Sequence, residues 1–211
     1  MFSTIVADPP WPYEIRGPAS SREHRPNSHG AATSSRERYG AMTIDELADM
    51  PVRSIAADDA NLYLWTTNSF LVEAHYVARA WGFEPKTMVT WVKVKPDGSP
   101  SMKTGFYYRG ATEHVLFCTG RKNRRLLGDP HPTVFSTPRL PHSVKPEYFY
   151  TMVEQQSGGP VLEIFARRLR VGWTSWGNEV GVDAAGIPMT ESVPSSMPRR
   201  GLTADLFGIK Q

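Results

Sequence analysis

Short apolar runs recur along the chain, and each ends at a turn residue or a polar stretch. Runs of roughly 4–8 residues rich in β-branched and aromatic side chains are typical of buried strands. This pattern predicts strands at residues 4–7, 60–66, 88–94, 114–119 and 160–166. The first of these strands stops at Asp8-Pro9-Pro10, where the chain must leave the sheet.

Amphipathic stretches separate the apolar runs and predict helices. Apolar positions between residues 70 and 81 fall on one helical face, and Gly82 follows as a stop signal. Thr43 and Glu46 have the spacing of a capping box, which starts a short helix. Pro146 opens a further helix, because proline is tolerated in the first turn. This alternation predicts an α/β fold with helices on both faces of a mostly parallel sheet.

Residues 14–40, 95–110 and 128–142 lack any apolar period. Structureless loops longer than about 12–15 residues are usually functional or disordered in a compact domain. After about residue 182 the chain becomes rich in Pro, Ser and Gly and loses its pattern. We therefore expect one folded domain over residues 1–182 and a flexible tail over residues 183–211.

The composition is that of a single soluble domain, with 211 residues of which 40% are hydrophobic and 21% charged. We expect no membrane span and no signal peptide. The single cysteine, Cys118, lies in an apolar run, which predicts a buried thiol and fits a reducing cytoplasm. The net charge of +3 permits a polyanionic partner. The histidines lack metal-ligand spacing, so no metal site is expected.

Asp8-Pro9-Pro10-Trp11 directly follows the first predicted strand. In open α/β sheets, ligands bind at the carboxyl ends of strands. An adenine amine has two hydrogens, and the Asp8 carboxylate and the Pro9 carbonyl offer the two acceptors that they need. Trp11 or Tyr13 would stack on the base, a contact worth about 1–3 kcal/mol. A strand-ending turn followed by a core tryptophan explains the same residues equally well.

Further motifs follow this tetrapeptide in order: Leu64-Trp65-Thr66-Thr67-Asn68, Trp91-Val92-Lys93, Lys103-Thr104-Gly105 with Glu113-His114, His142-Ser143-Val144-Lys145-Pro146, Leu162-Glu163-Ile164-Phe165-Ala166-Arg167, and Trp173 with Trp176-Gly177-Asn178-Glu179. The series resembles the MT-A70 family of N6-adenine methyltransferases over roughly residues 3–180. The resemblance implies a Rossmann-like S-adenosylmethionine-dependent methyltransferase fold with permuted motif order, the catalytic motif first and the cofactor strand last. The implied activity is methylation of adenine N6 in a nucleic acid, with catalysis at Asp8-Pro9-Pro10-Trp11.

The resemblance also implies how the cofactor is held. Lys145 is expected to pair with the methionyl carboxylate of S-adenosylmethionine, and Asp8 to lie near its amine or the transferred methyl. The sulfonium methyl is already activated, so neither a metal nor a covalent intermediate is needed. The enzyme mainly aligns the reacting atoms. We interpret Asp8 as a polarising acceptor and leave open whether it also acts as a base.

Other cofactor contacts are implied near the end of the domain. Glu163 and Phe165 lie on the last predicted strand, where a buried glutamate is costly unless it has a partner. Arg167 and Asn178 would hydrogen-bond the ribose hydroxyls. Glu179, which stands where many relatives carry Gln, can accept hydrogen bonds from the cofactor but cannot donate them.

The expected substrate is a flipped or single-stranded adenine. We expect DNA first, because a compact stand-alone member of this family resembles bacterial or phage enzymes, and RNA second. The arginines of the two polar loops would meet phosphates: Arg22, Arg25, Arg36, Arg38 and Arg139. The basic run at residues 121–125 is the alternative phosphate contact.

Two other functions remain open at this stage. The chain could methylate a small adenine-like compound, which the mild net charge allows. It could also be a catalytically inactive scaffold that binds nucleic acid or an active subunit. The intact motif at residues 8–11, together with Lys145, favours the enzyme over the scaffold. The sequence does not identify a protein partner.

Overall fold

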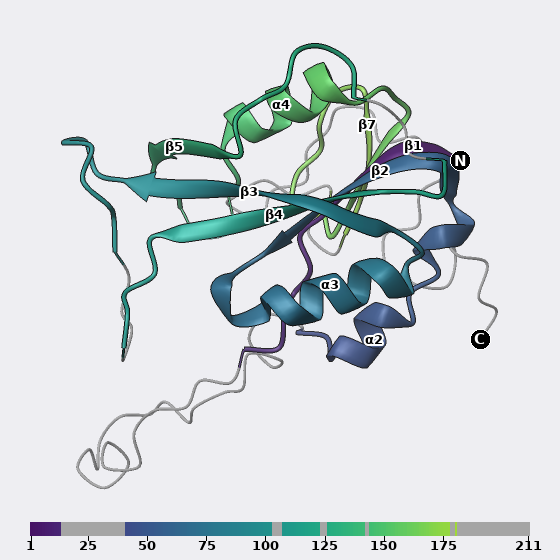
Figure 1. The fold of residues 1–211 in the computed structure, drawn as a ribbon, viewed down its shortest axis with the longest axis horizontal. Helices are drawn as coiled ribbons and strands as arrows, with labels where there is room; N and C mark the ends of the chain where they lie inside the picture. The colour runs from purple at the N-terminus through teal and green to yellow at the C-terminus, as the bar shows by residue number, and fades with distance from the viewer. Residues whose placement is uncertain (14–40, 103–106, 123–125, 142–143, 178–179, 181–211) are drawn as a thin grey trace, which may run out of the picture.

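The computed structural model describes residues 1–13, 41–102, 107–122, 126–141, 144–177 and 180, and its strands form one sheet (Figure 1). The strands are β1 (Phe2–Ala7), β2 (Ala56–Thr66), β3 (Glu84–Val94), β4 (Thr112–Thr119), β5 (Val134–Pro138), β6 (Val161–Ile164) and β7 (Trp173–Trp176). Their order across the sheet is β5-β3-β4-β2-β1-β6-β7. Within this described sheet, β4 is antiparallel to β2 and β3 and the other pairs are parallel, which confirms the mostly parallel sheet.

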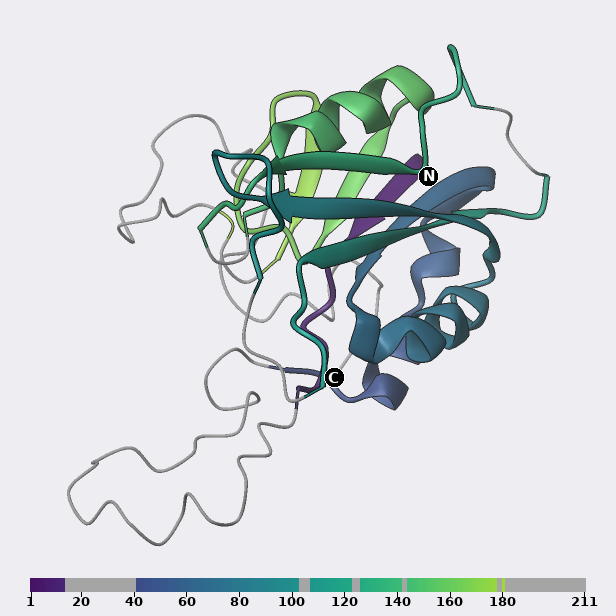
Figure 2. The same ribbon diagram turned by 60° about the vertical axis from the view of Figure 1, so that its left-hand side comes forward.

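Helices cover both faces of the sheet, as predicted. The helices α2 (Ile44–Ala48) and α3 (Leu71–Ala80) lie on one face, and α4 (Glu147–Gln156) lies on the other (Figures 1 and 2). The short 3-10 turns η2 (Val52–Ser54) and η3 (Asn68–Phe70) precede β2 and α3. The predicted capping box is confirmed, since the Thr43 side chain and the Glu46 carboxylate each accept the other's backbone N–H. No described helix is long and apolar enough to cross a membrane.

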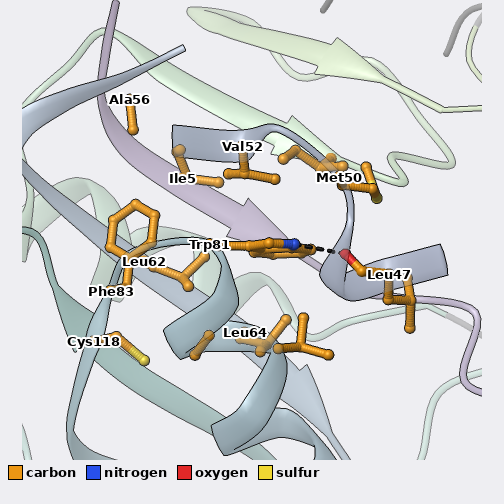
Figure 3. Packing of buried hydrophobic residues seen from close by; sticks show 14 of the residues in the cluster. Ile5, Leu47, Met50, Val52, Ala56, Leu62, Leu64, Trp81, Phe83 and Cys118 are labelled. Atoms are coloured by element: carbon orange, nitrogen blue, oxygen red, sulfur yellow. Dashed lines mark hydrogen bonds between the residues drawn. The ribbon is translucent and has the colours of Figure 1, made fainter. Parts of the chain in front are cut away.

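Trp81 is the centre of the core between the sheet and helices α2 and α3 (Figure 3). Its ring is fully buried, and its indole Nε1 donates to the backbone carbonyl of Leu47 in α2 at 2.7 Å. Gly82 follows with a φ of +80°, a left-handed conformation that glycine adopts without strain. The helical face and the stop signal predicted from the sequence are therefore confirmed. A second buried cluster, which includes Trp65 and Phe149, fills the space under α4.

Two edge strands depart from the sequence prediction. Strand β5 lies inside the segment 128–142 that was expected to lack structure, and β7 was not predicted. Each is short and pairs on one side alone in the described sheet. In β5 only Phe135 is buried, so the sequence carries almost no apolar period there. Cys118 is buried as predicted, and burial raises the pKa of its thiol to about 12.

The register of the strands brings the ends of several elements to one edge of the sheet. Ala7 pairs with Leu64 of β2 and with Ile164 of β6, so these parallel strands end together. The antiparallel β4 begins there, because His114 pairs with Thr66. Strands β3 and β5 also end at this edge. We call this the site edge, because Asp8 follows β1 directly.

Candidate active site

The Asp-Pro-Pro-Trp segment leaves β1 at the site edge with its backbone held on both sides. The Asp8 N–H donates to the carbonyl of Ile164 at 3.4 Å, and Met42 N–H donates to the carbonyl of Pro10 at 3.0 Å. The Pro9 carbonyl accepts the N–H of Trp11 at 2.9 Å rather than a sheet hydrogen bond. Because a carbonyl oxygen has two lone pairs, it retains one for a ligand.

Trp11 is a core residue in this structure, with 4% of its surface exposed. Its Nε1 donates to the carbonyl of Trp65 at 3.0 Å, and its ring stacks on Phe70 with centroids 5.5 Å apart. The burial of Trp11 matches the interpretation of this segment as a turn followed by a core tryptophan, and its predicted stacking on a base stays a prediction. Its ring anchors the Asp-Pro-Pro-Trp segment to the core, because the indole N–H bonds to β2 and the ring packs on η3.

Tyr13 is the aromatic side chain of this segment that remains accessible, at 42% exposed. Its ring stands edge-on to Phe70 at 4.9 Å, and its hydroxyl lies 2.8 Å from the Oγ1 of Thr67. Burial of the hydroxyl raises the pKa of Tyr13, and the carboxylates of Glu113 and Asp8 contribute in the same direction. Tyr13 is the more exposed of the two predicted stacking residues, and its contact with a base stays a prediction.

Lys145 and Asp8, which are 137 positions apart in the sequence, meet at the site edge. The Lys145 Nζ lies 3.0 Å from Asp8 Oδ2 and 3.0 Å from Glu113 Oε2, and it sits 4.6 Å above the ring of Trp65. Burial alone would lower the pKa of Lys145, but the two carboxylates outweigh it and the pKa is raised. The predicted convergence of Asp8 and Lys145 is thus present in the structure.

Glu113 joins this pair to a second buried ammonium. Its Oε1 contacts the Nζ of Lys93, whose side chain is 9% exposed and lies over the Trp91 ring at 4.5 Å. Burial alone would raise the pKa of Glu113, but Lys145 and Lys93 outweigh it and the pKa lies below its ordinary value. Lys93, Glu113, Lys145 and Asp8 thus form a row of alternating charges, which we call the charge row.

Sequence reasoning missed the charge row as a unit. Lys93 and Glu113 were noticed as parts of the family resemblance, without a role. The available signal was the position of charged residues at the ends of two strands that otherwise read as buried, since such charges need partners. Which charges pair depends on the register between β3 and β4, in which Trp91 faces Glu113.

His114 lies next to Glu113 and points to a different set of partners. Its Nε2 is 2.6 Å from the Oδ1 of Asn68, and its Nδ1 is 3.1 Å from the Oγ1 of Thr90. Burial lowers the pKa of His114, although Glu113 partly opposes this shift. A neutral imidazole can donate at one nitrogen and accept at the other, which suits these two partners.

Glu163 has the partner that its buried position requires. The hydroxyl of Tyr150 in α4 donates to its Oε1 at 2.9 Å, and the residue is 6% exposed. Burial raises the pKa of Glu163; the Tyr150 hydrogen bond opposes this, and the Asp8 charge adds to it. Phe165 follows with a φ of 65°, in the left-handed region, and its ring lies 6.0 Å from that of Trp176.

The ends of β6 and β7 approach each other closely at Gly177. A Cβ built on Gly177 would lie 2.2 Å from the carbonyl oxygen of Ala166, so only glycine fits there without movement. The N–H of Ala166 donates to the carbonyl of Trp176 at 2.9 Å. Arg167 comes next in the chain and is half-buried at this edge. Its predicted contact with a ribose stays a prediction, as does the role of Phe165.

Several predicted contacts lie outside the described residues: Asn178, Glu179, Arg22, Arg25, Arg36 and Arg38. Arg139 is described and exposed, and its N–H donates to the carbonyl of Val94 at 3.3 Å, which places it at the site edge. The described part of the basic run lies elsewhere. Lys122 pairs with Asp58 at 3.7 Å beyond the end of β4, at the opposite edge of the sheet.

Among the described residues, no group of three or more His, Cys, Asp or Glu side chains is placed to hold a metal ion. The side chains at the site edge are carboxylates, ammonium groups and aromatic rings. Such groups can bind an amine, a carboxylate and a flat heterocycle at neighbouring positions. The expectation of a metal-free site stays a prediction.

A mostly parallel sheet, with Asp8-Pro9-Pro10-Trp11 at the end of an interior strand and Lys145 against Asp8, defines a Rossmann-like methyltransferase fold. The chain belongs to the MT-A70 family, whose model matches residues 2–179.

Curated relatives of the chain are named as methyltransferases, and one of these names specifies RNA. The chain is 31% identical to the N6-methyladenosine RNA methyltransferase MTA1 of Cryphonectria parasitica over 85% of its own length and 52% of that protein. It is 30% identical to the type II methyltransferase M.MunI of Mycoplasma over 89% of its length and 81% of that protein. It is 28% identical to human N(6)-adenine-specific methyltransferase METTL4 over 85% of its length and 37% of that protein. The chain therefore spans about half of the fungal relative and most of M.MunI.

Proposed function

We propose that this chain transfers a methyl group from S-adenosylmethionine to N6 of adenine in a nucleic acid, with DNA as the preferred substrate. The observation that carries the proposal is the 3.0 Å contact between Lys145 Nζ and Asp8 Oδ2 at the end of β1. It holds the carboxylate of the family's hallmark motif at the edge where ligands of open α/β sheets bind.

The described residues fit the proposed cofactor. An ammonium has three donors, and Asp8 and Glu113 occupy two of those of Lys145, which leaves one for a methionyl carboxylate. The same two carboxylates can accept from a methionyl amine. Glu163 has one oxygen bonded to Tyr150 and a second oxygen that can accept from a hydroxyl or an amine. We propose that Phe165 and Arg167 complete this side of the cofactor site.

When bound, S-adenosylmethionine supplies an activated methyl group, so the residues of the chain mainly align and desolvate the amine. The Asp8 carboxylate and the free lone pair of the Pro9 carbonyl accept the two N6 hydrogens. Lys145 keeps Asp8 in place while it does so. After methylation the N6 proton passes to Asp8 or to water, and the geometry of Asp8 allows either route.

The proposed preference for DNA rests on how much of each relative's own length the chain matches. Among the relatives named above, M.MunI is matched over the largest share of its own length, while the RNA methyltransferase extends well beyond the matched region. RNA is the second candidate, because the MTA1 relative has the higher identity. The contact between Lys145 and Asp8 argues against an inactive scaffold. We also propose that the protein works in the reducing cytoplasm, where the buried thiol of Cys118 needs no partner.

The test is mass spectrometry of N6-methyladenine after separate incubation of the full chain and cofactor with single-stranded DNA, duplex DNA, RNA and adenosine. We expect the highest rate on DNA, and an Asp8→Ala variant should lose about 10²–10³-fold in kcat, as when one preorganised contact is removed. Circular dichroism of this variant should match that of the wild type. Product on RNA alone would move the substrate to RNA, product on adenosine alone would make it a small-molecule enzyme, and no product would favour the scaffold.

A further inference from the structure

Lys93 is a buried cation at the site edge that the proposed methyl transfer leaves unused. Its side chain reaches from the end of β3 under the α4 face of the sheet, where 9% of it is exposed. Burying an ammonium is costly unless it is paired and hydrogen-bonded. Its described partners are the Oε1 of Glu113 and the face of the Trp91 ring. The charge of Lys93 is therefore paired with the carboxylate of Glu113.

The register of the sheet explains why Lys93 meets Glu113. Trp91 faces Glu113 across β3 and β4, and Lys93 comes two residues later on the same face of the strand. Diagonal neighbours on one face of a sheet are within reach of long side chains. Lys93 therefore reaches the Oε1 of Glu113, while Lys145 contacts the Oε2 of the same carboxylate.

The two oxygens of Glu113 are divided between two ammonium groups. Oε1 faces Lys93, and Oε2 faces Lys145 at 3.0 Å. Lys145 in turn divides its donors between Glu113 and Asp8. If the charge of Lys93 were absent, Glu113 would be free to turn both oxygens to Lys145 and draw it away from Asp8.

We propose that Lys93 is a positioning residue, which fixes the Glu113 carboxylate so that Lys145 bridges Glu113 and Asp8 in the geometry that methyl transfer needs. The proposal rests on the proposed function for its kinetic consequence, but the contact itself can be tested without any substrate. Among the described residues, the groups that face Glu113 are Lys93 from β3, Lys145 ahead of α4, His114 next to it on β4, and Tyr13 after β1. Of these, Lys93 and Lys145 bond its carboxylate directly.

The kinetic test compares Lys93→Met, which keeps the length of the side chain but not its charge, with Lys93→Arg, which keeps the charge. We expect Lys93→Met to lower kcat about tenfold with little change in the KM for nucleic acid, and to move the acid limb of the pH–rate profile to higher pH. Lys93→Arg should recover most of the loss. Lys95→Met is the matched control, because Lys95 lies two residues further along and is exposed. Wild-type kcat in Lys93→Met, or an equal loss in Lys93→Met and Lys93→Arg, would overturn the proposal.

A second measurement separates this proposal from the proposed function. The side-chain carboxyl carbon of Glu113 is followed by 13C NMR across a pH series in the protein without substrate, with Glu113→Gln to assign the signal. We expect the pKa of Glu113 to rise in Lys93→Met and to stay unchanged in Lys95→Met, whether or not the protein methylates adenine. An unchanged pKa in folded Lys93→Met would refute the contact even if the wild type is an active methyltransferase.

Discussion

Lys145 contacts two carboxylates at once, and the proposed function gives it the methionyl carboxylate of the cofactor as a third partner. Replacing it with methionine removes the buried charge and keeps most of the side-chain volume. We expect the Kd for S-adenosylmethionine to rise about 10- to 100-fold, since a charge-assisted hydrogen bond contributes about 1.5–3 kcal/mol. The Kd for nucleic acid should change less. Titration calorimetry of Lys145→Met with each ligand measures both, and an unchanged cofactor Kd would remove Lys145 from the cofactor site.

The lowered pKa of Glu113 predicts how the free energy of unfolding changes at acid pH. The pKa of its carboxyl is lowered on folding from the ordinary value of 4.5, so the ionised group stabilises the folded state above that value. This stabilisation is lost as the pH falls below 4.5 through the folded pKa. Glu113→Gln should therefore lose less stability than the wild type between about pH 5 and pH 3. Urea unfolding of both proteins across this range provides the measurement, and parallel curves would contradict the prediction.

Some residues of the site could be identified from the sequence, and others could not. Asp8 and Lys145 could be singled out because each stands in a motif at a predicted strand end or helix start. The burial of Trp11 belonged to one of the two interpretations of its segment, but the Trp65 carbonyl that accepts from its indole could not be identified from the sequence. The contact of Lys93 with Glu113 depends on the pairing of β3 with β4, which the pattern along one strand does not contain.

At the scale of elements, Trp81 connects α3 to α2 through one hydrogen bond and a large buried ring. Trp81→Phe keeps an aromatic ring but leaves the Leu47 carbonyl without its indole donor. Loss of one partner of a buried hydrogen bond costs about 1–3 kcal/mol, and the smaller ring adds to this cost. Val72→Ala is the control, since Val72 lies in the same helix and is 79% exposed. The free energies of unfolding in urea should differ between the two variants, and equal values would refute this role of Trp81.

The elements differ in how far their sequences specify them. The interior strands are nearly continuous apolar runs, and α3 has an apolar face and a glycine stop, so their type and approximate position could be predicted. Strand β2 begins at Ala56, several residues before its apolar run, because its first part, with Asp58 and Asp59, lies largely outside the core. Strands β5 and β7 depend on a neighbouring strand for their hydrogen bonds, and that dependence leaves little trace in a short sequence.

Across the whole molecule, described basic residues lie at both of the sheet edges where strands end. Arg139 lies at the site edge, and so does Tyr13, the last described residue before segment 14–40. Arg121 and Lys122 lie at the opposite edge. A nucleic acid bound for methylation should contact the first group of charges rather than the second.

We therefore expect that changing Arg22, Arg25, Arg36 and Arg38 together to Ala raises the KM for nucleic acid and flattens its salt dependence. Each lost phosphate contact removes about one unit from the slope of log affinity against log salt. The control is Arg121→Ala with Lys122→Ala, which should leave the slope unchanged. Binding measured across a salt series compares the variants. A reduced slope in the control alone would transfer the phosphate contact to the opposite edge.

The burial of Cys118 makes the protein suitable for site-specific labelling. Thiol reagents react with the thiolate, and a fully buried thiol whose pKa is about 12 presents almost none at neutral pH. A cysteine introduced in place of the exposed Tyr107 would then be the main reactive thiol of the chain. A fluorophore attached there would report on the arrival of nucleic acid near the site edge, with little background from Cys118.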